Sequence, residues 1–126
     1  MKKSKQIFLF RVAILFIVVM FTVSFQSQTA KVTGTWNMTV ETSMGPGTPV
    51  FILKQENDSI ITGSYIGQFG EAPVKGTIKA NKMDLKFEAN NMSMEYIGII
   101  EGNSVKGKVV FGTMGEVKFT GIRKEK

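Results

Sequence analysis

Three short segments of the 126-residue chain repeat one pattern, in which a large apolar residue precedes a glycine. They read Ser43-Met44-Gly45-Pro46, Gln68-Phe69-Gly70-Glu71 and Thr113-Met114-Gly115-Glu116. Methionine is soft and adaptable at binding surfaces. The chemistry that these residues favour is recognition of an apolar partner, without bond making or breaking.

The sequence contains few residues that are suited to catalysis. Histidine and cysteine are absent, which excludes an imidazole base, a histidine-bound metal, a thiol nucleophile and disulfide bonds. The acidic residues are scattered singly, and no Gly-x-Ser-x-Gly elbow occurs. Because catalysis requires positioned acid–base partners, we expect a protein that is not an enzyme and has neither a metal site nor a cofactor.

Strands are expected on both sides of each repeated segment. After Ala30, apolar and polar residues alternate with period two, and short clusters of turn residues interrupt the alternation. Connections this short join antiparallel neighbours, so the expected topology is a simple meander. The eight predicted strands are Thr33–Glu41, Thr48–Glu56, Ile60–Gly67, Ala72–Ala80, Lys82–Ala89, Met92–Glu101, Ser104–Gly112 and Gly115–Arg123.

One face of the predicted sheet is apolar and the other is rich in lysine and acidic residues. Closing the sheet buries the apolar face and removes both edges. We therefore predict an all-β fold, an eight-stranded antiparallel up-and-down meander barrel. The predicted inward residues are Trp36, Met38, Val40, Phe51, Leu53, Ile61, Tyr65, Val74, Ile78, Met83, Leu85, Phe87, Met94, Tyr96, Ile100, Val105, Val109, Phe111, Val117 and Phe119.

Inward glycines recur between apolar residues on five of these strands, at Gly63, Gly76, Gly98, Gly107 and Gly121. Such glycines let the strands of a small barrel bend sharply. Two interpretations of the space beside them stay open. Either large aromatic side chains fill it, or it is a cavity that holds one ligand. The side chains concerned are Tyr65, Phe87, Tyr96 and Phe119.

The connections after the first, third, fifth and seventh strands lie at one end of an up-and-down barrel. All three repeated segments fall in that set, and Met92 follows the remaining connection. We expect a rim there, formed by Met44, Phe69, Met92 and Met114. The rim either folds in to cap the core or serves as a ligand portal or docking patch.

The segments "VTGTW", "ITGSY" and "FTGIRK" resemble the calycin group, the lipocalin-like and avidin-like barrels. The resemblance implies that a basic residue near the chain end stacks over a Gly-x-Trp on the first strand. The matching residues are Gly34, Trp36 and Arg123, and a cation over the indole would close one barrel end. The resemblance also matches Tyr65 to the tyrosine that points into the avidin ligand pocket.

The sequence departs from the avidin pattern at several points. Met38 and Gly67 stand where avidins carry a polar residue and a serine, and Trp36 is the only tryptophan. Biotin binding is therefore not expected. The whole chain also resembles small secreted bacterial domains of unknown role.

The first 30 residues have the order of a signal peptide: a basic start, an apolar run over Ile7–Phe25, and a small polar segment. We predict cleavage after Ala30, a single barrel domain over residues 31–126, and a secreted or periplasmic location. The alternative is an uncleaved membrane anchor, although Arg11 leaves the apolar run short for a span.

Most of the net charge of +6 belongs to this leader. Removing its four cations from the 16 lysines and arginines leaves 12 against 10 acidic residues. The remaining lysines alternate along strands and form no cluster, so nucleic-acid binding is not expected.

Two function hypotheses follow. The first is a non-catalytic barrel that binds a small apolar ligand through Tyr65, Phe87 and Tyr96 and the rim residues. The second is a module that docks to a protein or an envelope surface through the Met- and Phe-rich end.

Overall fold

A computed structural model describes residues 29–124 of the chain. The predicted signal peptide lies outside the described residues, apart from Thr29 and Ala30. Among residues 29–124 no helix is long and apolar enough to cross a membrane. The elements are β1 (Gly34–Thr42), β2 (Gly45–Gly47), β3 (Val50–Glu56), β4 (Ile60–Gly67), β5 (Gly70–Lys79), β6 (Lys82–Ala89), β7 (Met92–Glu101), β8 (Ser104–Phe111) and β9 (Glu116–Arg123).

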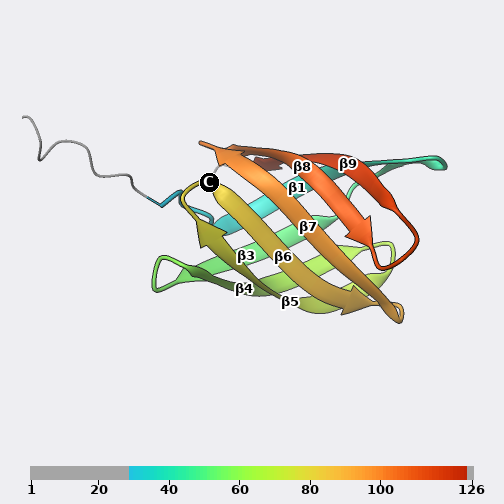
Figure 1. Cartoon of the computed structure of the whole chain (residues 1–126), viewed down its shortest axis with the longest axis horizontal. Coiled ribbons are helices and arrows are strands. Elements are labelled where there is room, and N and C mark those ends of the chain that lie inside the picture. Colours follow the sequence, from blue (N-terminus) through green and yellow to red (C-terminus); the bar gives the residue numbers. More distant parts are fainter. Residues whose placement is uncertain (1–28, 125–126) are drawn as a thin grey trace, which may run out of the picture.

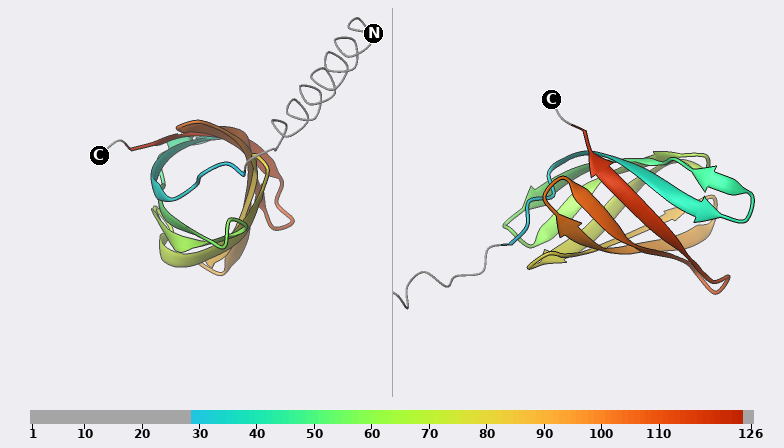
Figure 2. Two further views of the ribbon diagram at one scale, coloured as in Figure 1. Left: turned by 90° about the vertical axis from the view of Figure 1, so that its left-hand side faces the viewer. Right: turned by 90° about the horizontal axis from the view of Figure 1, so that it is seen from above.

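The strands follow one another around a closed antiparallel barrel (Figure 1). Neighbours in the sheet run in the order β2-β1-β3-β4-β5-β6-β7-β8-β9, and β1 also pairs with β9. That last pairing joins Trp36 to Arg123 and Val40 to Phe119, and it closes the ring seen along the barrel axis (Figure 2, left). The predicted eight-stranded meander barrel is confirmed.

Turns of two or three residues fix the register of several hairpins. Asn57 and Asp58 have φ angles of 52° and 60°, and Asn90 and Asn91 have φ angles of 53° and 60°. Asparagine and aspartate tolerate this left-handed conformation, which matches the twist of the flanking strands. The hairpins β3–β4 and β6–β7 therefore form where the sequence predicted breaks.

The expected turn over Ser43–Gly47 is only partly right, because its second half is a strand. Gly45–Gly47 forms β2 and pairs with Val40–Thr42 of β1. Thr48 and Pro49 then interrupt the strand pairing before β3 begins, since proline has no N–H to donate to the neighbouring strand. The carbonyl of Pro49 still accepts a 2.9 Å hydrogen bond from Met38. The β1–β2 hairpin thus projects past the barrel end (Figures 1 and 2).

The core matches the inward face predicted from alternation. Every predicted inward residue is buried except Phe111 and Val117, which pack against the core while partly exposed. Val32, Ala72 and Ala89 are buried in addition. Closing the sheet therefore buries one continuous apolar face, which is the main stabilising term for a barrel of this size.

Neighbouring atoms occupy the space beside the inward glycines. A Cβ at Gly107 would collide with the backbone carbonyl of Ile97, so two strands approach closely there. A Cβ at Gly121 would collide with the sulfur of Met38, and one at Gly98 would lie 3.0 Å from the Phe119 ring. At these positions the glycines admit backbone and side chains of the barrel itself.

Candidate functional site

The two ends of the barrel differ in how they are closed. One end, called the closed end below, holds the chain segment that leads into β1 and the connections β3–β4, β5–β6 and β7–β8. There the Arg123 guanidinium carbon lies 4.8 Å from the centroid of the Trp36 ring. Gly34, with φ of 142°, makes this possible, because a Cβ there would lie 2.9 Å from the Arg123 side chain.

Hydrogen bonds hold this closed end. Arg123 donates to the carbonyls of Lys31 (3.0 Å), Thr33 (3.2 Å) and Gly102 (2.9 Å). Its Nε also donates to the Asn103 side chain at 3.0 Å. Beneath it, the Trp36 indole N–H donates to the carbonyl of the fully buried Val32 at 2.8 Å. A ligand would have to displace this whole network to enter here.

The opposite end, called the open end below, carries a depression of about 410 Å³. All four predicted rim residues line it, one from each of the connections β1–β2, β4–β5 and β8–β9 and one from the start of β7. Met44 and Met114 are 97% and 78% exposed, whereas Phe69 packs partly against the core. The lining residues are Thr42, Ser43, Met44, Gly45, Pro46, Gly47, Gln68, Phe69, Met92, Phe111, Met114 and Val117.

Five aromatic rings fill the barrel interior next to this depression. Tyr65 stacks on Phe87 with ring centroids 4.6 Å apart, and Phe51 meets Tyr96 edge-on at 4.9 Å. Phe119 extends the cluster through Tyr96 at 5.0 Å. Rings at these separations are in direct contact, so they pack against one another and do not surround an empty lumen.

The predicted ligand residues therefore divide into two groups. Met44, Phe69, Met92 and Met114 come together around the depression. Tyr65, Phe87 and Tyr96 are almost fully buried in the aromatic cluster, and none of them lines the depression. Sequence reasoning did not single out Phe111 and Val117 as lining residues, because alternation marks them only as inward.

Tyr65 links the cluster to the β4–β5 connection. A Cβ on Gly67 would collide with its hydroxyl, and the backbone amide of Phe69 also faces that hydroxyl. Burial raises the pKa of Tyr65, and the Phe69 amide offsets part of this rise. The pKa of Tyr96 is raised more strongly, by burial and then by the nearby Tyr65. Both phenols are therefore neutral at ordinary pH.

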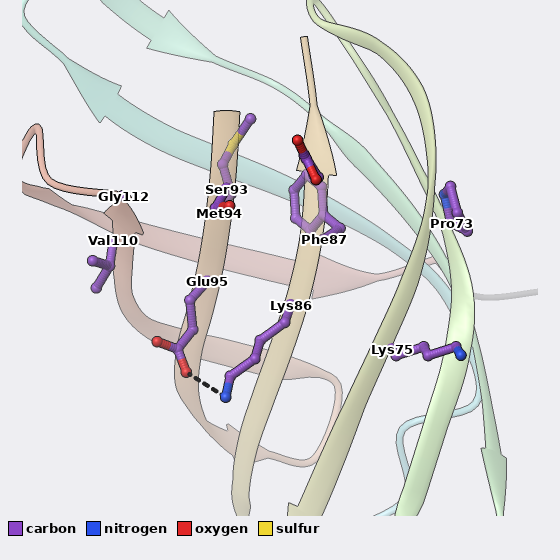
Figure 3. Close-up of a pocket in the computed structure, with 10 residues that line it drawn as sticks. Pro73, Lys75, Lys86, Phe87, Ser93, Met94, Glu95, Val110 and Gly112 are labelled. Carbon is purple, nitrogen blue, oxygen red and sulfur yellow. Dashed lines mark ion pairs between the residues drawn. The ribbon is translucent and has the colours of Figure 1, made fainter. Parts of the chain in front are cut away.

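A second hollow, of about 640 Å³, lies on the barrel wall (Figure 3). It opens where the β5–β6 register ends, at the pair Lys75–Lys86. The next β5 residue whose backbone points toward β6 is Pro73, which cannot donate to the ladder. The wall residues are Pro73, Lys75, Lys86, Phe87, Glu88, Ser93, Met94, Glu95, Val110 and Gly112. A proline within a strand was the one sequence signal for this wall groove.

Charged side chains dominate the edge of the wall groove. Lys86 and Glu95 approach to 3.8 Å, as drawn in Figure 3. A hydrogen bond with Asp84 raises the pKa of Glu95, as do burial and the charge of Asp84, while Lys86 and Lys108 oppose the rise. One carboxylate oxygen of Asp84 is buried with no hydrogen-bond partner. The groove therefore carries crowded charges of both signs on an exposed wall.

No protein-family model and no curated protein matches the sequence. Solved structures match the fold. A redesigned β-barrel, mFAP1 bound to DFHBI, has a TM-score of 0.57 at 12% identity and covers 73% of this chain and 94% of that one. The redesigned barrel b11L5F_LGL scores 0.58 at 14% identity, covering 75% and 91%. A third structure, a de novo designed fluorescence-activating barrel, scores 0.55 at 14% identity, covering 74% and 94%.

These likenesses concern the fold. The closed meander and these likenesses show that the chain folds as a small β-barrel. This fold is consistent with the calycin-like architecture that the Gly34, Trp36 and Arg123 motif implied.

Proposed function

We propose that the protein binds a small apolar ligand in the depression at the open end. The observation that carries the proposal is the convergence of Met44, Phe69, Met92 and Met114 on a hollow of about 410 Å³. That volume falls within the range of about 300–1,000 Å³ that is typical of small-molecule sites. Similar barrels can hold a small molecule, since mFAP1 was solved with DFHBI bound.

The aromatic cluster sets the depth of the proposed site. Because Tyr65, Phe87 and Tyr96 pack against one another, the ligand rests on the rim and on Phe111 and does not descend to the barrel centre. Flexible methionine side chains can adjust to the ligand. Each Å² of apolar surface that the contact removes from water stabilises the complex by about 25 cal/mol.

We propose further that the protein acts outside the cytoplasm and without catalysis. The support is the leader-like residues 1–30 and the absence of histidine and cysteine from the sequence. Cleavage after Ala30 would remove the 2.8 Å hydrogen bond from the Ala30 amide to Ala80, and leave Val32 in the core. Intact mass and N-terminal sequencing of protein from the extracytoplasmic fraction test this; an uncleaved chain retained in the cytoplasm would contradict it.

Nile red, a neutral dye whose fluorescence rises in apolar surroundings, tests binding. We expect saturable enhancement with the native protein and a clear loss with the double variant Phe69→Ser/Met114→Ser. The matched control is Ile52→Ser/Ile122→Ser, which removes exposed apolar residues from the outer wall. Equal dye binding by all three proteins would place the dye elsewhere and contradict the proposal.

The exposure of Met44 and Met114 supports a second candidate function, docking to another protein through the same end. A docking surface would protect these two side chains from oxidation only when the partner is present. In that case the native protein would bind no dye, and the Phe69→Ser/Met114→Ser variant would lose the partner.

A further inference from the structure

We propose that the depression selects ligands that carry a positive charge on an apolar body, such as an alkylammonium or an aromatic cation. The inference deepens the proposed function and rests on it. It comes from the distribution of charge around the open end, which the apolar lining alone does not reveal.

The depression offers an anion no charged partner. Its twelve lining residues include no charged side chain, and the described core contains no buried polar or charged residue. Arg123 lies at the closed end and already donates four hydrogen bonds. A carboxylate in the depression would lose hydration without gaining an ion pair, which is costly.

Acidic residues flank the mouth on several sides. Glu41 directly precedes Thr42 of the lining, and Glu71 follows Gly70 at the start of β5. Glu116 begins β9 beside the β8–β9 connection, and Glu88 lies one residue before the end of β6. All four are exposed. Their field attracts a cation to the mouth and repels an anion.

Lysines offset part of this field. Lys108 forms a 3.4 Å ion pair with Glu116, and Lys118 lies beside Lys108 in the register of β8 and β9. Glu41 and Glu71, on β1 and β5, form no ion pair within residues 29–124. Both carboxylates therefore add negative charge at the mouth without an ion pair. Glu41 is on β1, with Lys118 opposite it in the continued β1–β9 register, and Glu71 is on β5.

The lining suits a cation once it arrives. Phe69 and Phe111 present aromatic rings, and a cation near a ring face is attracted by its negative quadrupole. The polarizable methionine sulfurs add favourable contacts. An apolar body on the rim with its charged head turned outward toward Glu41 or Glu71 satisfies both parts of the site.

Competition against bound Nile red separates the ligand classes. The three competitors are decyltrimethylammonium, decanol and decanoate, which share a chain and differ in head-group charge, each below its micelle concentration. At low ionic strength we expect the cation to displace the dye at about tenfold lower concentration than the carboxylate, with the alcohol between them. In about 1 M salt, where the Debye length falls to about 3 Å, the gap should narrow sharply.

Two outcomes overturn the inference alone: decanoate displacing the dye as well as the cation does, or decanol matching the cation. In both, dye binding survives and so does the proposed function. Failure of the dye to bind, and of all three competitors to alter the protein's thermal stability, overturns the proposed function itself.

Two double variants, in which neutral amides replace carboxylates, show which acidic residues produce the preference for the cation. Glu41→Gln/Glu71→Gln should lose most of the preference for the cation while keeping the affinity for decanol. The matched control, Glu56→Gln/Asp58→Asn, removes two acidic charges next to the β3–β4 turn at the closed end and should keep the preference. Retention of the full preference by Glu41→Gln/Glu71→Gln would show that the mouth acids do not select the ligand.

Discussion

The guanidinium of Arg123 lies 4.8 Å from the centroid of the Trp36 ring, and the two residues are also register partners in the β1–β9 pairing that closes the barrel. One contact therefore joins the first and last strands, covers the indole and ties down the segment before β1 through the carbonyls of Lys31 and Thr33. It closes one end of the barrel, and the depression lies at the other.

This contact predicts a ranking of stabilities. Trp36→Ala should lower the free energy of unfolding by about 3–5 kcal/mol, as for other buried large aromatics. Arg123→Ala should cost less, yet more than Lys106→Ala on the exposed outer face, because four hydrogen bonds disappear with the guanidinium. Urea unfolding measures all three; Arg123→Ala and Lys106→Ala with the same small effect would show that the stack contributes nothing.

The chain contains two tyrosines, and both lie in the aromatic cluster. Their pKa values are raised by burial, so ionisation is opposed in the folded state. Stability should be fully present below the ordinary tyrosine pKa of about 10 and should fall as the pH rises above it. We expect tyrosinate absorbance to appear together with the loss of circular-dichroism signal. Early ionisation of both tyrosines in a folded protein would mean that the cluster is open to water.

Methionine oxidation should follow exposure. Met44 and Met114 are 97% and 78% exposed, while Met38, Met83 and Met94 are at most 3% exposed. Brief peroxide treatment should convert Met44 and Met114 to sulfoxides first, as read by peptide mass spectrometry. Because sulfoxides are polar, Nile red binding should weaken in parallel. Oxidation of the exposed pair with unchanged dye affinity would separate the rim from the binding site.

Glu95 on β7 tests the interaction between two neighbouring carboxylates, its own and that of Asp84 on β6. Its pKa is raised chiefly by Asp84, so its ionisation in the folded protein is unfavourable and stability falls as the pH rises through the raised pKa. Glu95→Gln should therefore be more stable than the parent at pH 7, with the gain shrinking toward pH 4. The control Glu101→Gln replaces a carboxylate at the far end of β7, away from Asp84. A less stable Glu95→Gln at pH 7 would mean that the 3.8 Å pair with Lys86 dominates.

Alternation along the sequence was enough to predict the barrel, the inward face and the position of the rim. Trp36, Met38 and Val40 alternate with polar residues, and short connections such as Asn90-Asn91 leave antiparallel pairing as the natural outcome. The order of the connections then brings Met44, Phe69, Met92 and Met114 to one end.

The presence of strand β2 and the filling of the lumen depend on geometry that the alternation of apolar and polar residues does not encode. The strand β2 was missed because Gly45, Pro46 and Gly47 have turn composition, and only the extra length of β1 beyond β3 gives them a partner. The filling of the lumen by Tyr65 and Phe87 depends on how far the strands coil. That quantity belongs to the whole sheet and to no single segment.

A side chain that fills the depression should block a ligand site there. Gly47 lines the depression with an ordinary backbone conformation, and a Cβ there would meet only the Val40 side chain at 4.0 Å. Gly47→Phe therefore adds a ring at the hollow without a clash at its Cβ. Thr39→Phe adds the same ring to the exposed outer face of β1 as the control.

The measurement is a Nile red titration of the parent and both variants, with circular dichroism to confirm folding. We predict that Gly47→Phe weakens binding by about tenfold or more and that Thr39→Phe matches the parent. Unchanged affinity in a folded Gly47→Phe protein would show that the dye binds outside the depression, and no saturable binding by the parent would show that the protein has no such site.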